Sequence, residues 1–234
     1  MINPAMKTSR SLKPRRDRFA LAREDRETAL RRTRSRLILD GAWKVFARDG
    51  LDGATMRAIA LEAGCTTGAI YPLFASKEAI YAELLAESLQ RLFDHVRAAA
   101  EGQQESAATL RAGALAFVEY YRTRADEVTL GLYLWHGVRP RGLSRDLDSE
   151  LNRRLGDTLA LLQSGIGSLA KHKPVTAHHE VAALFAFLIG ALVVNQTGRL
   201  KTLGSTLDGI VELHIEALIA RLQASPGTNA VRSP

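Results

Sequence analysis

The residues with the clearest chemical meaning lie in one stretch, residues 55–74, which reads TMRAIALEAGCTTGAIYPLF. Gly64 divides this stretch into two short segments whose apolar residues can pack one helix across the other. This pattern is typical of a helix-turn-helix, in which the second helix offers its first residues to the major groove of DNA. Spacing alone is a moderate signal, and an ordinary helical hairpin within a bundle is the alternative.

Aromatic side chains gather in a second stretch, within twenty residues of one another. They are Phe117, Tyr120, Tyr121, Tyr133, Trp135 and His136. Small-molecule sites are usually apolar pockets with a few polar groups, so this cluster is a candidate ligand site. The alternative is ordinary core aromatics with satisfied hydroxyls, which is the better interpretation for any single residue. For the cluster as a whole the two interpretations are about even.

The histidines do not form a metal-binding pattern. The candidate ligands are His172, His178, His179, Glu180, His214 and Cys65. Their spacing matches no compact zinc motif, and adjacent histidines diverge by about 100° around a helix. We therefore expect no metal and no cofactor. A single cysteine also excludes an intramolecular disulfide.

The elements that carry these residues are expected to be helices throughout. Apolar residues recur three and four positions apart in nearly every segment, and no alternating runs predict strands. Thr55 and Ser76 are the expected N-caps, and Gly50 is the expected end of the first helix. The sequence predicts about nine helices, at residues 33–48, 55–63, 66–74, 77–100, 107–124, 126–135, 147–169, 176–197 and 205–223.

Positive charge is concentrated at the start of the chain. The 234 residues carry a net charge of +7, but residues 1–36 contain twelve basic and four acidic side chains, which is +8. We expect residues 1–30 to form a flexible basic arm, which suits a polyanion such as nucleic acid or an anionic membrane. A solvated tail without a role is the alternative.

The overall composition is that of a soluble globular chain, with 46% hydrophobic and 24% charged residues. Residues 1–18 lack the apolar run of a signal peptide. The longest apolar run, residues 181–194, is shorter than the roughly 18 residues that suggest a membrane span, so it predicts a buried core helix. We expect a cytoplasmic protein with no membrane partner.

A longer set of residues resembles the N-terminal domain of the tetracycline-repressor (TetR) family. After the Asp49-Gly50-Leu51 turn, the matching positions are Thr55, Ile59-Ala60, Ala63-Gly64, Gly68, Ile70-Tyr71, Phe74 and Ser76-Lys77-Glu78. The resemblance implies an all-α fold with a three-helix DNA-binding domain at residues 31–80. It also implies a helical ligand-binding and dimerisation domain at residues 81–224, before a flexible tail at residues 225–234.

The resemblance implies a set of DNA contacts. The residues are Thr55, Arg57, Thr66, Thr67, Gly68, Ala69, Tyr71 and Lys77, joined by Arg31, Arg32 and Arg34 at the end of the arm. Pro72 stands where the family often has histidine, and a proline there is expected to shorten the recognition helix. The recognition helix also lacks Arg, Asn and Gln, so thymine methyl groups and DNA shape are expected to carry specificity.

The resemblance also implies a homodimer, a small-molecule effector and a double-stranded DNA operator. The expected dimer interface consists of Phe185, Leu188, Leu192, Leu207, Ile210, His214 and Leu218, and an intramolecular core is the alternative. These features together predict a transcriptional repressor, not an enzyme, that an effector in the aromatic cluster releases from its operator. A sequence-independent DNA-binding protein remains open, as does a helical enzyme, for which no nucleophile–base pair stands out.

Deleting residues 1–30 should weaken binding to every DNA duplex if the arm contacts phosphates. The slope of log affinity against log salt concentration should then flatten by about 0.9 for each phosphate that the truncated protein no longer neutralises. Titrations of wild-type and truncated protein at several salt concentrations measure this slope. An unchanged slope would show that the arm does not touch phosphates.

Overall fold

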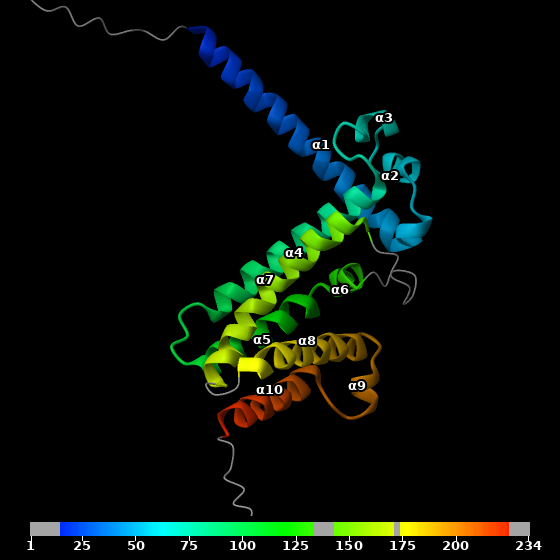
Figure 1. The fold of residues 1–234 in the computed structure, drawn as a ribbon. Coiled ribbons are helices and arrows are strands. Elements are labelled where there is room, and N and C mark those ends of the chain that lie inside the picture. The colour runs from blue at the N-terminus through cyan, green and yellow to red at the C-terminus, as the bar shows by residue number, and fades with distance from the viewer. Residues whose placement is uncertain (1–14, 133–142, 171–173, 225–234) are drawn as a thin grey trace, which may run out of the picture.

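The computed structural model describes residues 15–132, 143–170 and 174–224, in which all regular elements are helices (Figure 1). They are α1 (Arg15–Gly53), α2 (Met56–Glu62), α3 (Thr67–Ile70), α4 (Lys77–Ala100), α5 (Ser106–Arg122), α6 (Ala125–Gly131), α7 (Arg145–Leu169), α8 (Pro174–Gln196), α9 (Arg199–Thr202) and α10 (Leu207–Gln223). The all-α prediction is confirmed for this part of the chain.

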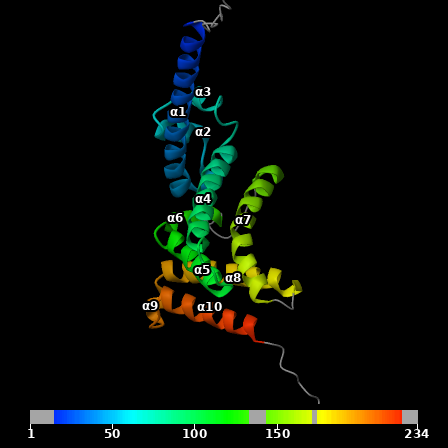
Figure 2. The ribbon, with the colours of Figure 1, turned by 90° about the vertical axis from the view of Figure 1, so that its left-hand side faces the viewer.

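The helices form a small N-terminal unit and a larger C-terminal one, joined by α4. Helices α1, α2 and α3 lie at one end of the molecule, and α8 and α10 lie at the other end in both views (Figures 1 and 2). The N-terminal part of α1 projects beyond α2 and α3. Helices α5 and α7 pack along α4 to build the centre of the larger unit.

Side-chain caps determine where several helices begin. Thr55 accepts a hydrogen bond from the backbone N–H of Ala58 at 3.1 Å, and Ser76 accepts one from the N–H of Ala79 at 3.2 Å. Both predicted N-caps are therefore confirmed. Gly50 adopts a φ of 67°, which interrupts α1 where a left-handed residue was expected.

The first helix begins much earlier than expected. It starts at Arg15 instead of near Thr33, so residues 15–30 of the expected flexible arm are helical. These residues favour helix by composition, and Arg23 and Glu27 form an ion pair one turn apart at 3.0 Å. The high charge of residues 15–30 therefore did not indicate a flexible segment, because these residues form the first part of α1.

Other elements also differ from the sequence-based ranges. Helix α3 ends at Ile70, short of residue 74, because Pro72 has no N–H to continue the ladder. The connection before the last helix contains the extra short helix α9, so the described residues hold ten helices and not nine. Helix α6 ends at Gly131, and the rest of the predicted 126–135 helix lies mostly outside the described residues.

Helix α4 belongs to both units because its buried residues face both cores. Tyr81, near its start, packs edge-on against Phe46 of α1, with ring centroids 5.2 Å apart. Leu92 and Val96, near its end, are fully buried in the larger unit. The crossing of α1 and α2 depends on Gly41, because a Cβ there would lie 2.8 Å from the backbone nitrogen of Ala63.

Helix α8 contains a segment, Ala177–Gln196, that is long and apolar enough by composition to cross a membrane. Only 33% of its most apolar window is buried inside the chain. Buried Leu184, Leu188 and Leu192 face the core. The rest of the helix therefore leaves an apolar face without cover from the described residues.

Candidate nucleic-acid interface and effector pocket

The expected recognition residues form an exposed row at the tip of the N-terminal unit. Thr66, Gly68, Ala69 and Tyr71 are at least partly exposed, while Ile70 between them is completely buried. Tyr71 keeps 56% of its surface exposed although it is a large aromatic residue. Burial of Ile70 fixes the short helix to the unit and turns its polar side outward.

Three further expected DNA contacts, Thr55, Arg57 and Thr67, lie at the starts of α2 and α3. The Thr55 hydroxyl caps α2 and stays exposed, and Thr67, at the start of α3, is half-buried. Arg57 is at least partly exposed and forms no ion pair with the described residues. Its guanidinium is therefore available to an external anion.

Lys77 has an intramolecular role that the sequence did not suggest. Its ammonium group donates hydrogen bonds to the carbonyl oxygens of Asp52 at 3.1 Å and Ala54 at 2.9 Å. These bonds attach the start of α4 to the connection between α1 and α2. One of the three N–H groups remains for a phosphate, so Lys77 is at once an internal clamp and a candidate DNA contact.

A groove joins the basic extension of α1 to the end of the recognition helix. It encloses about 380 Å³, and its lining residues are Glu27, Leu30, Arg31 and Arg34 of α1 together with Ala69, Pro72 and Leu73. The structure therefore brings two of the three expected arginines next to the recognition residues. Arg32 is exposed but does not line the groove.

A separate pocket lies inside the C-terminal unit between helices α4, α5, α6, α7 and α8. Its cavity volume is about 60 Å³, smaller than that of the groove, and its lining is mainly aliphatic. Representative lining residues are Leu85, Leu89, Tyr121, Val128, Leu155 and Phe185. A largely apolar lining with few polar groups is the usual construction of a small-molecule site.

The expected aromatic cluster contributes one residue to this pocket. Tyr121 lines it, whereas Phe117 is buried behind Tyr121 with ring centroids 5.1 Å apart. Tyr120 points into a polar network instead. Tyr133, Trp135 and His136 lie outside the described residues.

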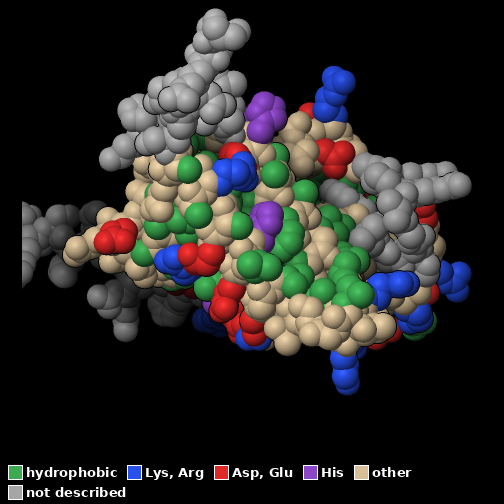
Figure 3. Space-filling model, turned by 90° about the horizontal axis from the view of Figure 1, so that it is seen from below, with side chains coloured by type: hydrophobic (Ala, Val, Ile, Leu, Met, Phe, Trp, Pro, Cys, Tyr) green, Lys and Arg blue, Asp and Glu red, His purple; other side chains and the backbone are tan. Residues whose placement is uncertain are grey.

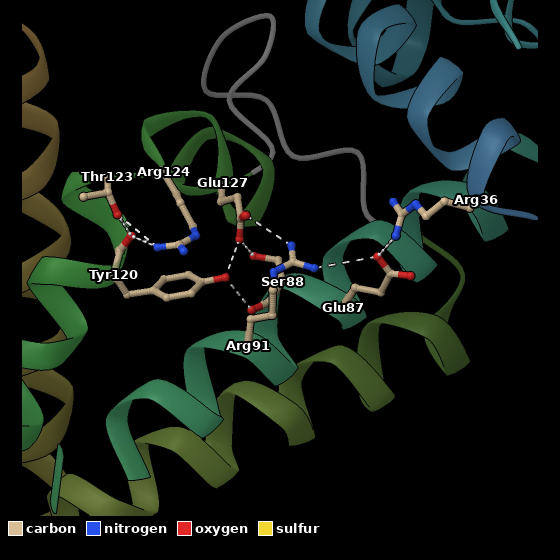
Figure 4. A network of polar contacts seen from close by, with 8 residues as sticks. All are labelled: Arg36, Glu87, Ser88, Arg91, Tyr120, Thr123, Arg124 and Glu127. Atoms are coloured by element: carbon tan, nitrogen blue, oxygen red, sulfur yellow. Dashed lines mark hydrogen bonds and ion pairs between the residues drawn. The ribbon is translucent and has the colours of Figure 1, made fainter. Parts of the chain in front are cut away.

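That polar network connects α6 and α5 to α1 through α4 (Figure 4). The carboxylate of Glu127 accepts hydrogen bonds from the hydroxyls of Tyr120 at 2.6 Å and Ser88 at 2.5 Å, and pairs with Arg91 at 3.1 Å. Burial and the nearby Glu127 carboxylate raise the pKa of Tyr120, so its hydroxyl stays protonated and donates.

The network continues along α4 toward the basic extension. Arg91 lies 3.7 Å from Glu87, and Glu87 accepts a hydrogen bond from Arg36 of α1 at 2.9 Å. Arg36 is half exposed, so this last ion pair contributes only about 0–1 kcal/mol by itself. The buried end of the network at Glu127 holds its helices more firmly than the exposed end.

Most of the expected dimer interface is buried within the chain itself. Leu188, Leu192, Leu207 and Leu218 are at most 5% exposed, and Phe185 lines the pocket, so none of these offers a surface to a second copy. Of the seven residues, only Ile210 and His214 lie on the open side. The spacing of apolar residues correctly pointed to α8 and α10. The residues that it picked out, however, lie mostly on the sides of these helices that pack inside the chain.

The open side of α8 and α10 carries a different apolar surface, which we call the bare face. Figure 3 shows apolar side chains gathered around a histidine on this side of the molecule. The bare face consists of Ala183, Ala186, Phe187, Gly190 and Val194 of α8 with Ile210, Leu213, His214 and Ala217 of α10. The His214 ring stacks on Phe187 at 3.8 Å, and Leu213 is 73% exposed.

The described residues contain no group of three histidine, cysteine or acidic side chains placed to hold a metal ion. Glu180, one of the candidate ligands, instead forms an ion pair with Arg221. Burial, and next the positive charge of Arg221, lower the pKa of His214. His172 lies outside the described residues.

Comparison with known proteins gives the N-terminal unit a family. The model for bacterial regulatory proteins of the tetR family matches residues 38–84. The transcriptional repressor KstR2 of Rhodococcus jostii is 35% identical over 96 residues, which is 41% of this chain and 46% of that protein. The chain therefore spans about half the length of this curated relative.

Solved structures extend the similarity of the fold to most of the chain. A tetR-family regulatory protein from Rhodococcus RHA1 superposes with a TM-score of 0.66 at 19% identity, covering 82% of this chain and 98% of that one. The regulator FadR from Bacillus subtilis, in complex with stearoyl-CoA, gives a TM-score of 0.62 at 17% identity, covering 81% and 98%. Both helical units thus follow one known architecture.

Replacing Lys77 with methionine should lower the free energy of unfolding by about 1–3 kcal/mol, because it leaves two backbone carbonyls without their charged donor. The matched variant Lys44→Met removes an exposed ion pair with Glu62 and should change this free energy by less than about 1 kcal/mol. Urea unfolding of both variants measures the difference. Equal decreases would show that Lys77 does not clamp the connection between α1 and α2.

Proposed function

Because the chain belongs to the TetR family of bacterial regulatory proteins, we propose that it is a transcriptional repressor that binds its operator as a homodimer and is released by a small molecule. The observation that carries this proposal is the exposed recognition row beside Arg57 and the groove with Arg31 and Arg34. Tyr71, a large aromatic residue, is 56% exposed among the small residues of this row.

The proposed DNA contacts divide into two kinds. Thr66, Thr67, Ala69 and Tyr71 would reach base edges, because they stand at the exposed tip of the recognition helix. Arg31, Arg32, Arg34 and Arg57, with Thr55 and the remaining N–H of Lys77, would contact phosphates, and Gly68 lets the backbone approach closely. This division agrees with the distribution of charge along the chain. Residues 37–80, which contain the proposed base contacts, carry four basic and five acidic side chains and therefore have no excess of positive charge.

Dimerisation is proposed to use the bare face of α8 and α10. This surface is continuous, apolar and remote from the recognition helix (Figure 1). Two copies joined there would present two recognition helices on one side, as binding to two half-sites requires. Exposed Leu213 and the stacked pair of Phe187 and His214 would lie near the centre of the interface.

The proposed release depends on contacts between the effector pocket and α4. Leu85 and Leu89 of α4 line the pocket, and the same helix holds the N-terminal unit through Lys77 and Tyr81. The pocket wall and the polar network are directly connected along the chain. Tyr121 of the wall follows Tyr120 of the network, and Val128 of the wall follows Glu127 of the network. An effector that binds tightly to only one of two conformations, which differ in the position of α4, would therefore change the fraction of dimers that can bind DNA.

The proposal gives this chain no catalytic role and places it in the cytoplasm, where its DNA is. The pocket lining offers an aliphatic wall without a paired nucleophile and base among the described residues. FadR of Bacillus subtilis was solved with stearoyl-CoA, and a relative from Paenarthrobacter nicotinovorans is a nicotine-responsive repressor. The compounds named for these two proteins are very different.

A sequence-independent DNA-binding protein is the second candidate, and the basic helical extension of α1 supports it. Such a protein would bind every duplex through phosphates alone. The two candidates differ in whether duplexes selected from a random library share a motif.

Replacing Tyr71 with alanine should weaken binding to a selected duplex by about 5- to 100-fold and relax its sequence preference, because alanine cannot reach the base edge. Arg57→Ala should weaken binding to all duplexes evenly and reduce the salt slope by about 0.9. Fluorescence anisotropy with selected and random duplexes measures both effects.

The matched control is Arg145→Ala, which removes an exposed arginine at the start of α7, in the C-terminal unit. It should leave both affinities unchanged. Wild-type affinity of the Tyr71→Ala protein for the selected duplex would refute the proposed recognition surface.

A further inference from the structure

The effector pocket has a chemical selectivity of its own. We infer that it binds an uncharged, largely apolar molecule that presents one hydrogen-bond acceptor, such as a carbonyl or ether oxygen, to the hydroxyl of Tyr121. This inference rests on the proposed function, because it defines the class of molecule to which the repressor responds.

The first observation is an unused hydroxyl inside an apolar wall. Tyr121 is only 4% exposed and lines the pocket, yet its hydroxyl makes no hydrogen bond with any described residue. Its neighbour Tyr120, similarly buried, is hydrogen-bonded to Glu127. Polar groups in an apolar wall are normally satisfied, so an unpaired hydroxyl on a residue that lines the cavity indicates a partner that enters it.

The second observation is that the ring of Tyr121 is held in place. Phe117 and Tyr120 both pack edge-on against it, with centroid distances of 5.1 and 5.2 Å, and Phe185 packs behind Phe117. The hydroxyl therefore cannot swing away to find another partner without disturbing this aromatic cluster. A fixed donor selects for the position of the acceptor on the ligand.

The protonation state of Tyr121 makes it a donor. Burial, followed by the neighbouring Tyr120 and Glu127, raises the pKa of the Tyr121 phenol well above its ordinary value. It remains neutral and protonated at physiological pH, so it offers a proton and not a negative charge.

The remaining wall argues against a charged ligand. Among the described lining residues there is no charged side chain, and Asn152, which is exposed, is the other polar one. An ion moved from water into this wall would lose its hydration without gaining a partner of opposite charge from these residues. The pocket therefore favours neutral molecules, with Tyr121 as the specificity-determining residue.

Three small probes of similar size test this selectivity on the full chain: acetophenone, which carries one carbonyl acceptor, ethylbenzene, which carries none, and benzoate, which is an anion. Ligand-observed NMR titrations give the affinity of each. The wild-type protein should bind acetophenone more tightly than benzoate. Tyr121→Phe should weaken acetophenone about three- to tenfold and leave ethylbenzene unchanged or slightly tighter, because only the hydrogen bond is removed.

The matched control is Thr158→Val, which removes a buried hydroxyl of the C-terminal unit outside the pocket lining and should leave all three affinities unchanged. The inference is overturned if benzoate binds as tightly as acetophenone, or if Tyr121→Phe affects acetophenone and ethylbenzene equally. The first comparison needs no variant, so it stands even if Tyr121→Phe folds poorly.

Selection of duplexes from a random library separates this inference from the proposed function. A protein that selects a DNA motif but prefers benzoate refutes the inference alone. A protein that shows the expected ligand preference but selects no motif refutes the proposed function and leaves the pocket chemistry standing.

Discussion

One buried tyrosine joins the two units of this protein. The ring of Tyr81, which is 1% exposed, packs on Phe46 of α1, and its hydroxyl donates a hydrogen bond to the carbonyl of Leu130 in α6 at 2.7 Å. Leu130 precedes Gly131 and Leu132, which line the effector pocket. The same side chain therefore contacts the DNA-binding unit and the pocket wall. The ion pairs from Arg36 to Glu127 run beside this contact, but their exposed part is weakened by water and salt.

This arrangement explains how a small recognition helix can be regulated from a distance. Helix α3 has four residues, so its position depends on its neighbours: Ile70 anchors it in the unit, and Lys77 clamps the preceding connection to α4. A movement of α4 would move the whole N-terminal unit as one body. In the proposed complex the basic helical extension of α1 would supply general attraction to DNA, so affinity and sequence selection would reside in different elements.

The sequence predicted the helical class, the caps at Thr55 and Ser76 and the turn at Gly50, because each depends on local residues. The sequence-based prediction was wrong for residues whose role depends on which side of their helix packs against the rest of the chain. Helix α8 is apolar on all sides, so periodicity could not show that Leu188 faces inward and Phe187 outward. Likewise, the neighbours Tyr120 and Tyr121 have identical side chains but lie in a polar network and an apolar pocket, respectively. The role of Lys77 depends on carbonyl groups 23 and 25 residues away, which no motif reveals.

The most direct test of coupling between the two units is the affinity of Tyr81→Phe for a duplex selected by the wild-type protein. This change keeps the aromatic ring that packs on Phe46 and removes the hydroxyl that donates to α6. Thr158→Val is the matched control, because it removes another buried hydroxyl from the C-terminal unit, one that has no hydrogen-bond partner among the described residues. If Tyr81 transmits the position of α6 to the DNA-binding unit, Tyr81→Phe should weaken DNA binding by about fivefold or more, and Thr158→Val should not. Wild-type affinity in the Tyr81→Phe protein would contradict this mechanism.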